Sequence, residues 1–128
     1  DDLDGSLAAC TEARDIMARS GDQRGVALAD ISHGWLELRR GDIDSAEHQF
    51  RAALATLQQI EAHVESAEAI EGLAAVADSR GERSAAIRQF HEAQALREAT
   101  GIHPDFMSRI GHQADRRALR ARLSTTNP

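Results

Sequence analysis

The chain has 128 residues, a formal net charge of -6 and only 3% aromatic residues. This length suits one domain, and the abundance of alanine, leucine, arginine and glutamate predicts an all-α fold and excludes an all-β one. The acidic balance argues against a general nucleic-acid binder, because neutralising phosphates requires a cationic surface.

Six helices are predicted along the chain, at about 3–19, 23–40, 43–59, 63–80, 83–99 and 105–123. The corners are expected at Gly21-Asp22, Gly41-Asp42 and Gly81-Glu82. There the glycine can end one helix in the left-handed conformation, and the acidic residue can cap the next helix. Pro104 fits the first turn of the last helix, and residues 124–128 are predicted to be a disordered tail.

Two stretches of the chain match at a shift of 40 residues, since Arg40-Gly41-Asp42 recurs as Arg80-Gly81-Glu82. The match continues in the following helices, with the pairs Ala46/Ala86, Gln49/Gln89, Phe50/Phe90 and Ala53/Ala93. The sequence therefore predicts one domain of helical repeats. Its parts are the second helix of a truncated repeat (1–20), two repeats (21–60 and 61–100), a capping helix (101–123) and the tail (124–128).

This alternation of small and large residues resembles the tetratricopeptide repeat (TPR). The residues that carry the resemblance are Gly34 or Ala74, Gly41 or Gly81, Ala46 or Ala86, Phe50 or Phe90, and Ala53 or Ala93. The resemblance implies a right-handed superhelix of antiparallel helix hairpins with about six helices. The unit of about 40 residues is longer than the usual TPR unit of about 34.

Longer units of this kind are similar to the C-terminal arrays of bacterial signal-transduction ATPases and of LuxR-type, maltose-activator-like transcription regulators. Two stretches carry the similarity, 71–77 and 95–101. It implies a scaffold that senses an inducer or a partner within a larger regulator. The chain begins at Asp1 in helical patterning without an initiator methionine, so we expect it to be a segment of such a polypeptide.

The first helix of each repeat is predicted to line a concave, partner-binding face. The candidate residues are Leu28, Ile31, Trp35, Leu38, Arg39, Glu68, Glu71 and Asp78. An apolar floor beside a carboxylate wall suits a peptide or helix with apolar anchors and basic residues. Another interpretation stays open for each half: Ile31, Trp35 and Leu38 also have the spacing of a core stripe, and the acids that of a solvated helix face.

Positive charge gathers at the C-terminus. Residues 104–128 carry five arginines against two aspartates, whereas the remainder carries ten arginines against nineteen acids. Docking of this helix against the acidic body, or favourable charge at a helix C-terminus, explains the arginines better than contact with DNA does. At the other end, Leu3, Leu7, Cys10 and Ile16 form an apolar strip that could support a homodimer.

The sequence predicts a protein that is not an enzyme and holds no cofactor. It contains no phosphate-binding loop, nucleophile elbow, H-E-x-x-H pair or dinucleotide turn. Six histidines are scattered singly, so no metal site is expected. One cysteine, Cys10, and no apolar run long enough for a membrane predict a soluble cytoplasmic protein. A small-molecule inducer sensor and an accessory domain of a signalling enzyme remain alternatives.

Overall fold

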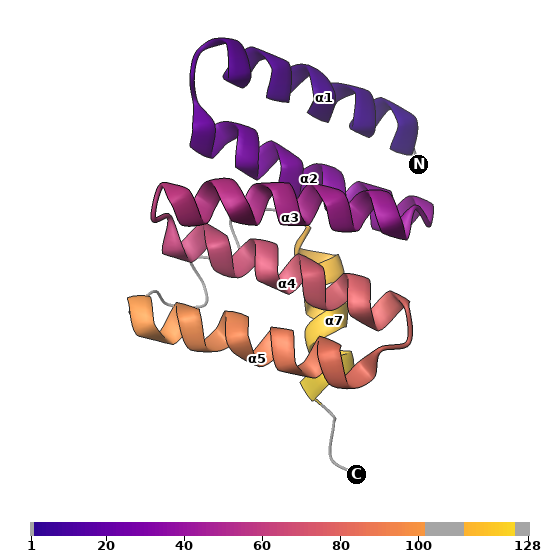
Figure 1. The fold of residues 1–128 in the computed structure, drawn as a ribbon. Helices are drawn as coiled ribbons and strands as arrows, with labels where there is room; N and C mark the ends of the chain where they lie inside the picture. The colour runs from indigo at the N-terminus through magenta and orange to yellow at the C-terminus, as the bar shows by residue number, and fades with distance from the viewer. Residues whose placement is uncertain (1, 102–111, 125–128) are drawn as a thin grey trace.

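The computed structural model describes residues 2–101 and 112–124, and the regular secondary structure of this part is all α-helix (Figure 1). The helices are α1 (Leu3–Arg19), α2 (Gln23–Arg40), α3 (Ile43–Gln59), α4 (His63–Ser79), α5 (Arg83–Thr100) and α7 (Gln113–Ser124). The all-α prediction is confirmed, and the first five predicted ranges agree to within one residue. Ser124 ends α7 instead of beginning a tail, while Pro104 and residues 125–128 lie outside the described residues.

The helices are separated by turns that recur at positions 21, 41, 61, 81 and 101, each with a positive φ. In the first four turns the next N–H closes the loop onto a carbonyl five residues back, as Asp22 N does to Met17 O at 2.9 Å. Glycine occupies four of the five positions because it takes the left-handed conformation without strain at Cβ. Glu61 adopts the same conformation, with a φ of 57°.

The predicted acidic caps form at only one of the three glycine corners. The Asp22 carboxylate accepts a hydrogen bond from Gly25 N at 2.9 Å. Asp42 and Glu82 also occupy N-cap positions, but neither makes a side-chain cap hydrogen bond. Glutamate is not among the preferred capping residues, so the prediction was weakest at Glu82.

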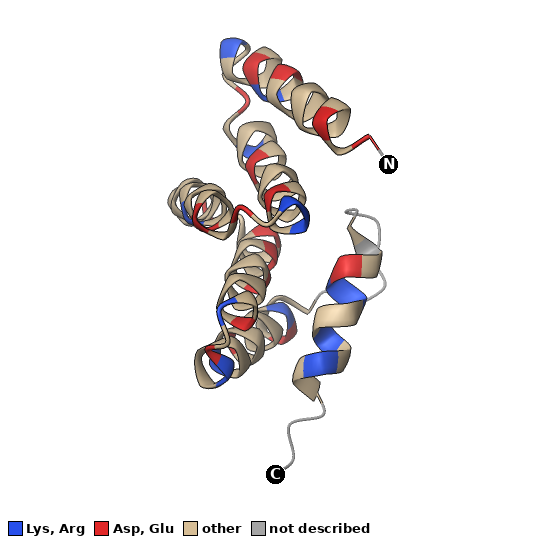
Figure 2. Cartoon of the chain, turned by 90° about the vertical axis from the view of Figure 1, so that its right-hand side faces the viewer, with Lys and Arg blue, Asp and Glu red and all other residues tan. Residues whose placement is uncertain are grey.

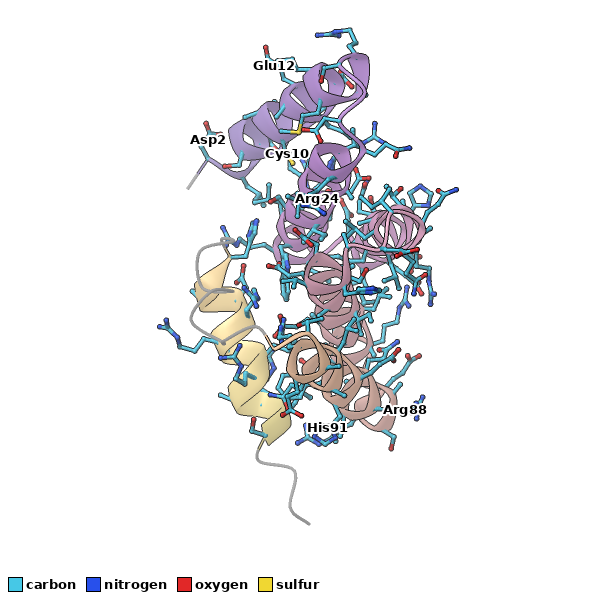
Figure 3. The ribbon with its side chains drawn as sticks, turned by 90° about the vertical axis from the view of Figure 1, so that its left-hand side faces the viewer. Asp2, Cys10, Glu12, Arg24, Arg88 and His91 are labelled. Atoms are coloured by element: carbon cyan, nitrogen blue, oxygen red, sulfur yellow. The ribbon has the colours of Figure 1, made fainter. Side chains whose placement is uncertain are left out.

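Helices α1 to α5 follow one another in space, and each packs antiparallel against the next (Figure 1). Helices α2 and α4 also contact each other and form a layer. Seen from the two sides of the molecule, α3 lies on one face of this layer and α7 on the other (Figures 2 and 3). The C-terminal helix therefore crosses the side of α2 and α4 that α3 leaves open.

Phe50 of α3 lies at the centre of the apolar core and is fully buried. Its ring packs against Gly34 of α2 and Gly72 of α4. A Cβ at Gly34 would lie 2.7 Å from the ring, and one at Gly72 would lie closer still. Glycine at both positions thus lets two helices close on one aromatic ring, and this contact fixes the spacing of α2, α3 and α4.

The N-terminal helix α1 is held against α2 by polar contacts as well as by buried Leu7. Arg14 Nε lies 2.7 Å from Asp30 Oδ1, and Cys10 Sγ donates to Ala29 O at 3.1 Å between the two helices (Figure 3). Burial raises the pKa of the Cys10 thiol. On the outer side Ile16 is 53% exposed. Within residues 2–101 and 112–124, no helix has both the length and the apolar character to cross a membrane.

Candidate functional site

Helix α4 is buried on every side along most of its length. Each residue from Ser66 to Ala77 is buried, including the two glutamates Glu68 and Glu71. Helices α2, α3 and α5 cover three sides, and α7 covers the remaining one (Figure 2). We call the covered surface the α7-binding face; its residues are Trp35, Leu38 and Arg39 of α2 and Glu68, Glu71, Ala75, Asp78 and Ser79 of α4.

Two buried acids and two buried arginines meet at the middle of this face. Glu71 Oε1 accepts hydrogen bonds from Arg97 Nη2 of α5 at 2.8 Å and from Arg116 Nε of α7 at 2.9 Å. Glu68 Oε2 lies 3.7 Å from Arg116 Nη1. The four residues are between 0% and 7% exposed. Charges so far from water are stable only when they are paired, so Arg116 secures α7 to α4.

Glu68 is the least well compensated member of this buried cluster. Burial raises its pKa from 4.5 to about 7, although the nearby Arg116 guanidinium acts in the opposite direction. Its Oε2 has no hydrogen-bond partner among the described residues, and neither has Glu71 Oε2. The interpretation of these acids as a solvated helix face is wrong for both glutamates, because α5 and α7 exclude water from them.

The apolar part of the face centres on Trp35. Its ring meets Phe50 edge to face with centroids 5.6 Å apart, and the His112 ring stacks on it at 6.4 Å. Burial lowers the pKa of His112 below its usual 6.5. From α7, the side chains of Leu119 and Leu123 are fully buried. Trp35 is itself only 4% exposed, so α7 extends the core over it.

Ion pairs join α7 to its neighbours at the edges of the face. Arg39 Nη2 lies 2.9 Å from Asp115 Oδ2, and Arg122 Nε lies 2.8 Å from Asp78 Oδ2. The packing between these pairs is incomplete. A cavity of about 150 Å³ remains there, lined by Trp35 and other side chains of α2, α4 and α7. The Trp35 Nε1 donor has no hydrogen-bond partner within residues 2–101 and 112–124.

The predicted partner-binding residues fall into two groups. The first group lies on the α7-binding face and consists of Trp35, Leu38, Arg39, Glu68, Glu71 and Asp78. The second group, Leu28 and Ile31, belongs to the core, where Ile31 is buried and Leu28 partly buried. The structure therefore brings six of the eight residues onto one surface, and α7 occupies it. Whether a partner binds them stays a prediction.

The candidate residues from the sequence did not include the residues of α7 and α5 that take part in this contact, although a basic helix was expected to be able to dock on the acidic body. Arg116, Leu119 and Leu123 follow a spacing of i, i+3 and i+7, which places them on one side of a helix. That spacing was a usable signal. Arg97 gave none, because its partner Glu71 is 26 residues away on another helix.

Within the described part of the chain, no group of three or more histidine, cysteine or acidic side chains is arranged to hold a metal ion. Comparisons with protein-family models, curated proteins and solved structures find no match for this chain. A function for the chain is therefore inferred from its fold and from the α7-binding face.

Proposed function

We propose that this chain is a non-catalytic scaffold for protein interactions, built from TPR-like repeats in a right-handed superhelix. In this proposal it forms part of a larger bacterial transcription or signalling regulator in the cytoplasm. It binds a protein or peptide partner on the face formed by the first helices of its repeats, α2 and α4.

The observation that supports this proposal is the occupation of that face by a helix. Helix α7 lies against α2 and α4 through Asp115, Arg116 and Arg122, which pair with residues of both helices. The turns that separate the helices recur at positions 21, 41, 61 and 81. A regular array in which the first helices of the repeats form one continuous face is the arrangement by which repeat proteins present a binding surface. Such a layer recognises helices through apolar anchors and charge.

Panning a library of random peptides against the intact chain tests the scaffold function. We expect the affinity of selected peptides to change in the Arg39→Glu chain, because Arg39 lies on the α7-binding face, pairs with Asp115 of α7 and has a side chain that is 43% exposed. Arg88→Glu is the matched control. Arg88 is exposed and lies on the side of α5 away from α7 (Figure 3). If no peptide is selected, or if both variants bind every peptide with the affinity of the unaltered chain, the scaffold proposal is wrong.

A second candidate is an inducer sensor, and the cavity of about 150 Å³ beside Trp35 favours it. That volume suits a small metabolite or a few water molecules. A thermal-shift screen with a metabolite panel separates this candidate from the first. A ligand present at 100 times its dissociation constant adds about 2.7 kcal/mol to the free energy of unfolding. A screen without any shift would exclude the metabolites tested.

A further inference from the structure

Helix α7 contacts the rest of the molecule as a peptide ligand would. Its buried side chains, Arg116, Leu119 and Leu123, lie on one side of the helix. Arg117 and Arg120 are exposed on the other side. The helix presents two apolar anchors with basic residues beside them. The same features make helical peptides bind grooves in other proteins.

The α7-binding face in turn requires a cationic occupant. Glu68 and Glu71 are 2% and 0% exposed, and of the two arginines beside them only Arg97 comes from outside α7. An occupant without a cation at the position of Arg116 would leave two buried acids with one arginine. An uncompensated buried charge is strongly unfavourable. At the edge of the face, Asp78 pairs with Arg122. It therefore favours a second basic residue in the occupant, six positions after the one that corresponds to Arg116.

The fit of α7 to this face is incomplete. The cavity of about 150 Å³ is lined on the α7 side by Asp115, Ala118 and Arg122, and the small methyl group of Ala118 leaves the space between the two charged side chains unfilled. Trp35 Nε1 also has no hydrogen-bond partner among the described residues. Contacts that are not made contribute no attraction. A helix with the same charges and a larger side chain at this position would therefore bind the face more tightly than α7 does.

We propose that the α7-binding face receives a basic amphipathic helix of a partner protein, and that α7 is its built-in competitor. The partner helix carries the pattern of α7, namely arginine, leucine and leucine at i, i+3 and i+7, with arginine at i+6. This inference rests on the scaffold function proposed above and names the class of partner. Binding of the partner requires α7 to leave, so the affinity for the partner depends on the fraction of chains in which α7 is undocked.

A labelled peptide of residues 112–124 with Ala118→Leu, titrated into the full chain by fluorescence anisotropy, tests this inference. Arg122→Glu in the chain sets a second acid against Asp78 and loosens α7, so we expect the peptide to bind about tenfold more tightly than to the unaltered chain. Arg120→Glu is the matched control. It makes the same charge change at an exposed position of the same helix, and we expect no change in affinity.

A charge exchange locates the binding site. Asp78→Arg in the chain sets an arginine against position 122 of both α7 and the peptide, so we expect little net change in the affinity of the unaltered peptide. A peptide that carries Arg122→Glu should bind this variant more tightly than the unaltered peptide does. Both positions lie at the edge of the face, where the side chain of Arg122 is 53% exposed and that of Asp78 is 19% exposed. These variants are therefore expected to keep the fold. Circular dichroism checks that each chain retains its helix content.

Four results would overturn the inference. Equal affinity for the Arg122→Glu and Arg120→Glu chains would place the peptide elsewhere, and so would a failed charge exchange. Dimers of the Arg122→Glu chain that the peptide dissociates would make a second copy, rather than another protein, the occupant. The last is the selection of library peptides that are not basic amphipathic helices but whose binding depends on Arg39. That result would support the scaffold function and exclude only the basic helix as the partner.

Discussion

The core around Phe50 and the contact under α7 join helices by different chemistry. Around Phe50 the contact is apolar, and Gly34 and Gly72 bring two helices onto one ring. Under α7 the central contact is a cluster of buried charges, with the acids on α4 and the arginines on α5 and α7. Apolar burial is non-directional and supplies most of the stability of a fold. Buried charge supplies less net stability, but it penalises every unmatched partner.

In the function proposed above, this difference separates a permanent part of the molecule from an exchangeable one. The Phe50 contact has no charged member, so its strength does not depend on the ionisation of a side chain in it. The α7 contact depends on ionisation and on the partner that supplies the cation. Substitutions and changes of pH can therefore test whether the two regions respond as differently as their chemistry implies.

Phe50→Ala is expected to have the largest effect. Phe50 is fully buried, and removal of a core aromatic ring costs about 3–5 kcal/mol in free energy of unfolding. Urea denaturation followed by circular dichroism measures this loss. Ile16→Ala, at a side chain that is 53% exposed, is the control and should change the free energy by less than about 0.5 kcal/mol. A loss below 1 kcal/mol on Phe50→Ala would mean that this ring does not organise the core.

The second prediction concerns the pH dependence of the charged contact. The pKa of Glu68 is about 7 in the folded state against 4.5 for an ordinary glutamate, so the folded chain keeps a proton that the unfolded chain has lost. The free energy of unfolding should therefore fall as pH rises from about 4.5 to 7 and stay level above that. The total fall is at most about 3 kcal/mol. The charged groups that influence Glu68 are Arg116 of α7, Arg97 of α5, and Glu71 and Glu65 of α4.

Glu68→Gln is the control for this pH dependence, since its amide does not titrate. His112 has the opposite influence, because its lowered pKa makes stability rise with pH below about 6.5. The contribution of Glu68 is therefore the difference between the urea-derived free energies of the two chains at each pH. If that difference is constant from pH 4.5 to 7, Glu68 keeps its ordinary pKa and the cluster is better solvated than the structure shows.

Gly72→Ala tests the same apolar contact by adding a methyl group to it, whereas Phe50→Ala removes a ring. A Cβ at this position would overlap the Phe50 ring, and overpacking of a core costs about 1–3 kcal/mol. A smaller side chain at position 50 should relieve the overlap. We therefore expect Gly72→Ala to cost less in a Phe50→Leu background, and a double-mutant cycle from urea denaturation measures this coupling. Additive losses would show that the ring and Gly72 do not share one contact.

The sequence predicted the apolar region well because its signals are local and repeated. Glycine at positions 21, 41 and 81 marked helix ends, and the spacing of Phe50 and Phe90 marked the core. The turn at Glu61 was not marked in this way, because Glu61 takes the left-handed conformation that glycine usually provides. There the surrounding helices impose the turn on a residue that does not favour it.

The charged region was much less predictable. The pair of Arg116 and Glu71 joins residues 45 apart, and their meeting depends on the direction in which α7 crosses α4. Net charge indicated only that a basic helix could dock on an acidic body. Likewise the spacing of Ile31, Trp35 and Leu38 fitted both a binding floor and a core stripe. The choice between them depends on whether α7 covers Trp35, which is not encoded in α2.

The smallest expected effect is at the exposed edge of the charged contact. Arg39 and Asp115 form an ion pair at 2.9 Å with side chains 43% and 32% exposed. Exposed pairs contribute about 0.2–1 kcal/mol, so a double-mutant cycle with Arg39→Ala and Asp115→Ala should give a coupling in that range. The coupling should shrink at about 1 M salt, where the screening length falls to about 3 Å.

His112 offers an independent measure of the same pair, because both charges act on it. Asp115 raises the pKa of His112 and Arg39 lowers it, in addition to the larger lowering by burial. A titration of the imidazole signals by nuclear magnetic resonance should therefore move the pKa down in Asp115→Ala and up in Arg39→Ala. Opposite movements with a weak, salt-sensitive coupling would show that α7 is docked but held only loosely at this edge. A pKa that stays unchanged in both variants would mean that the start of α7 does not lie against α2 in solution. The charged contact would then be confined to the cluster around Glu71.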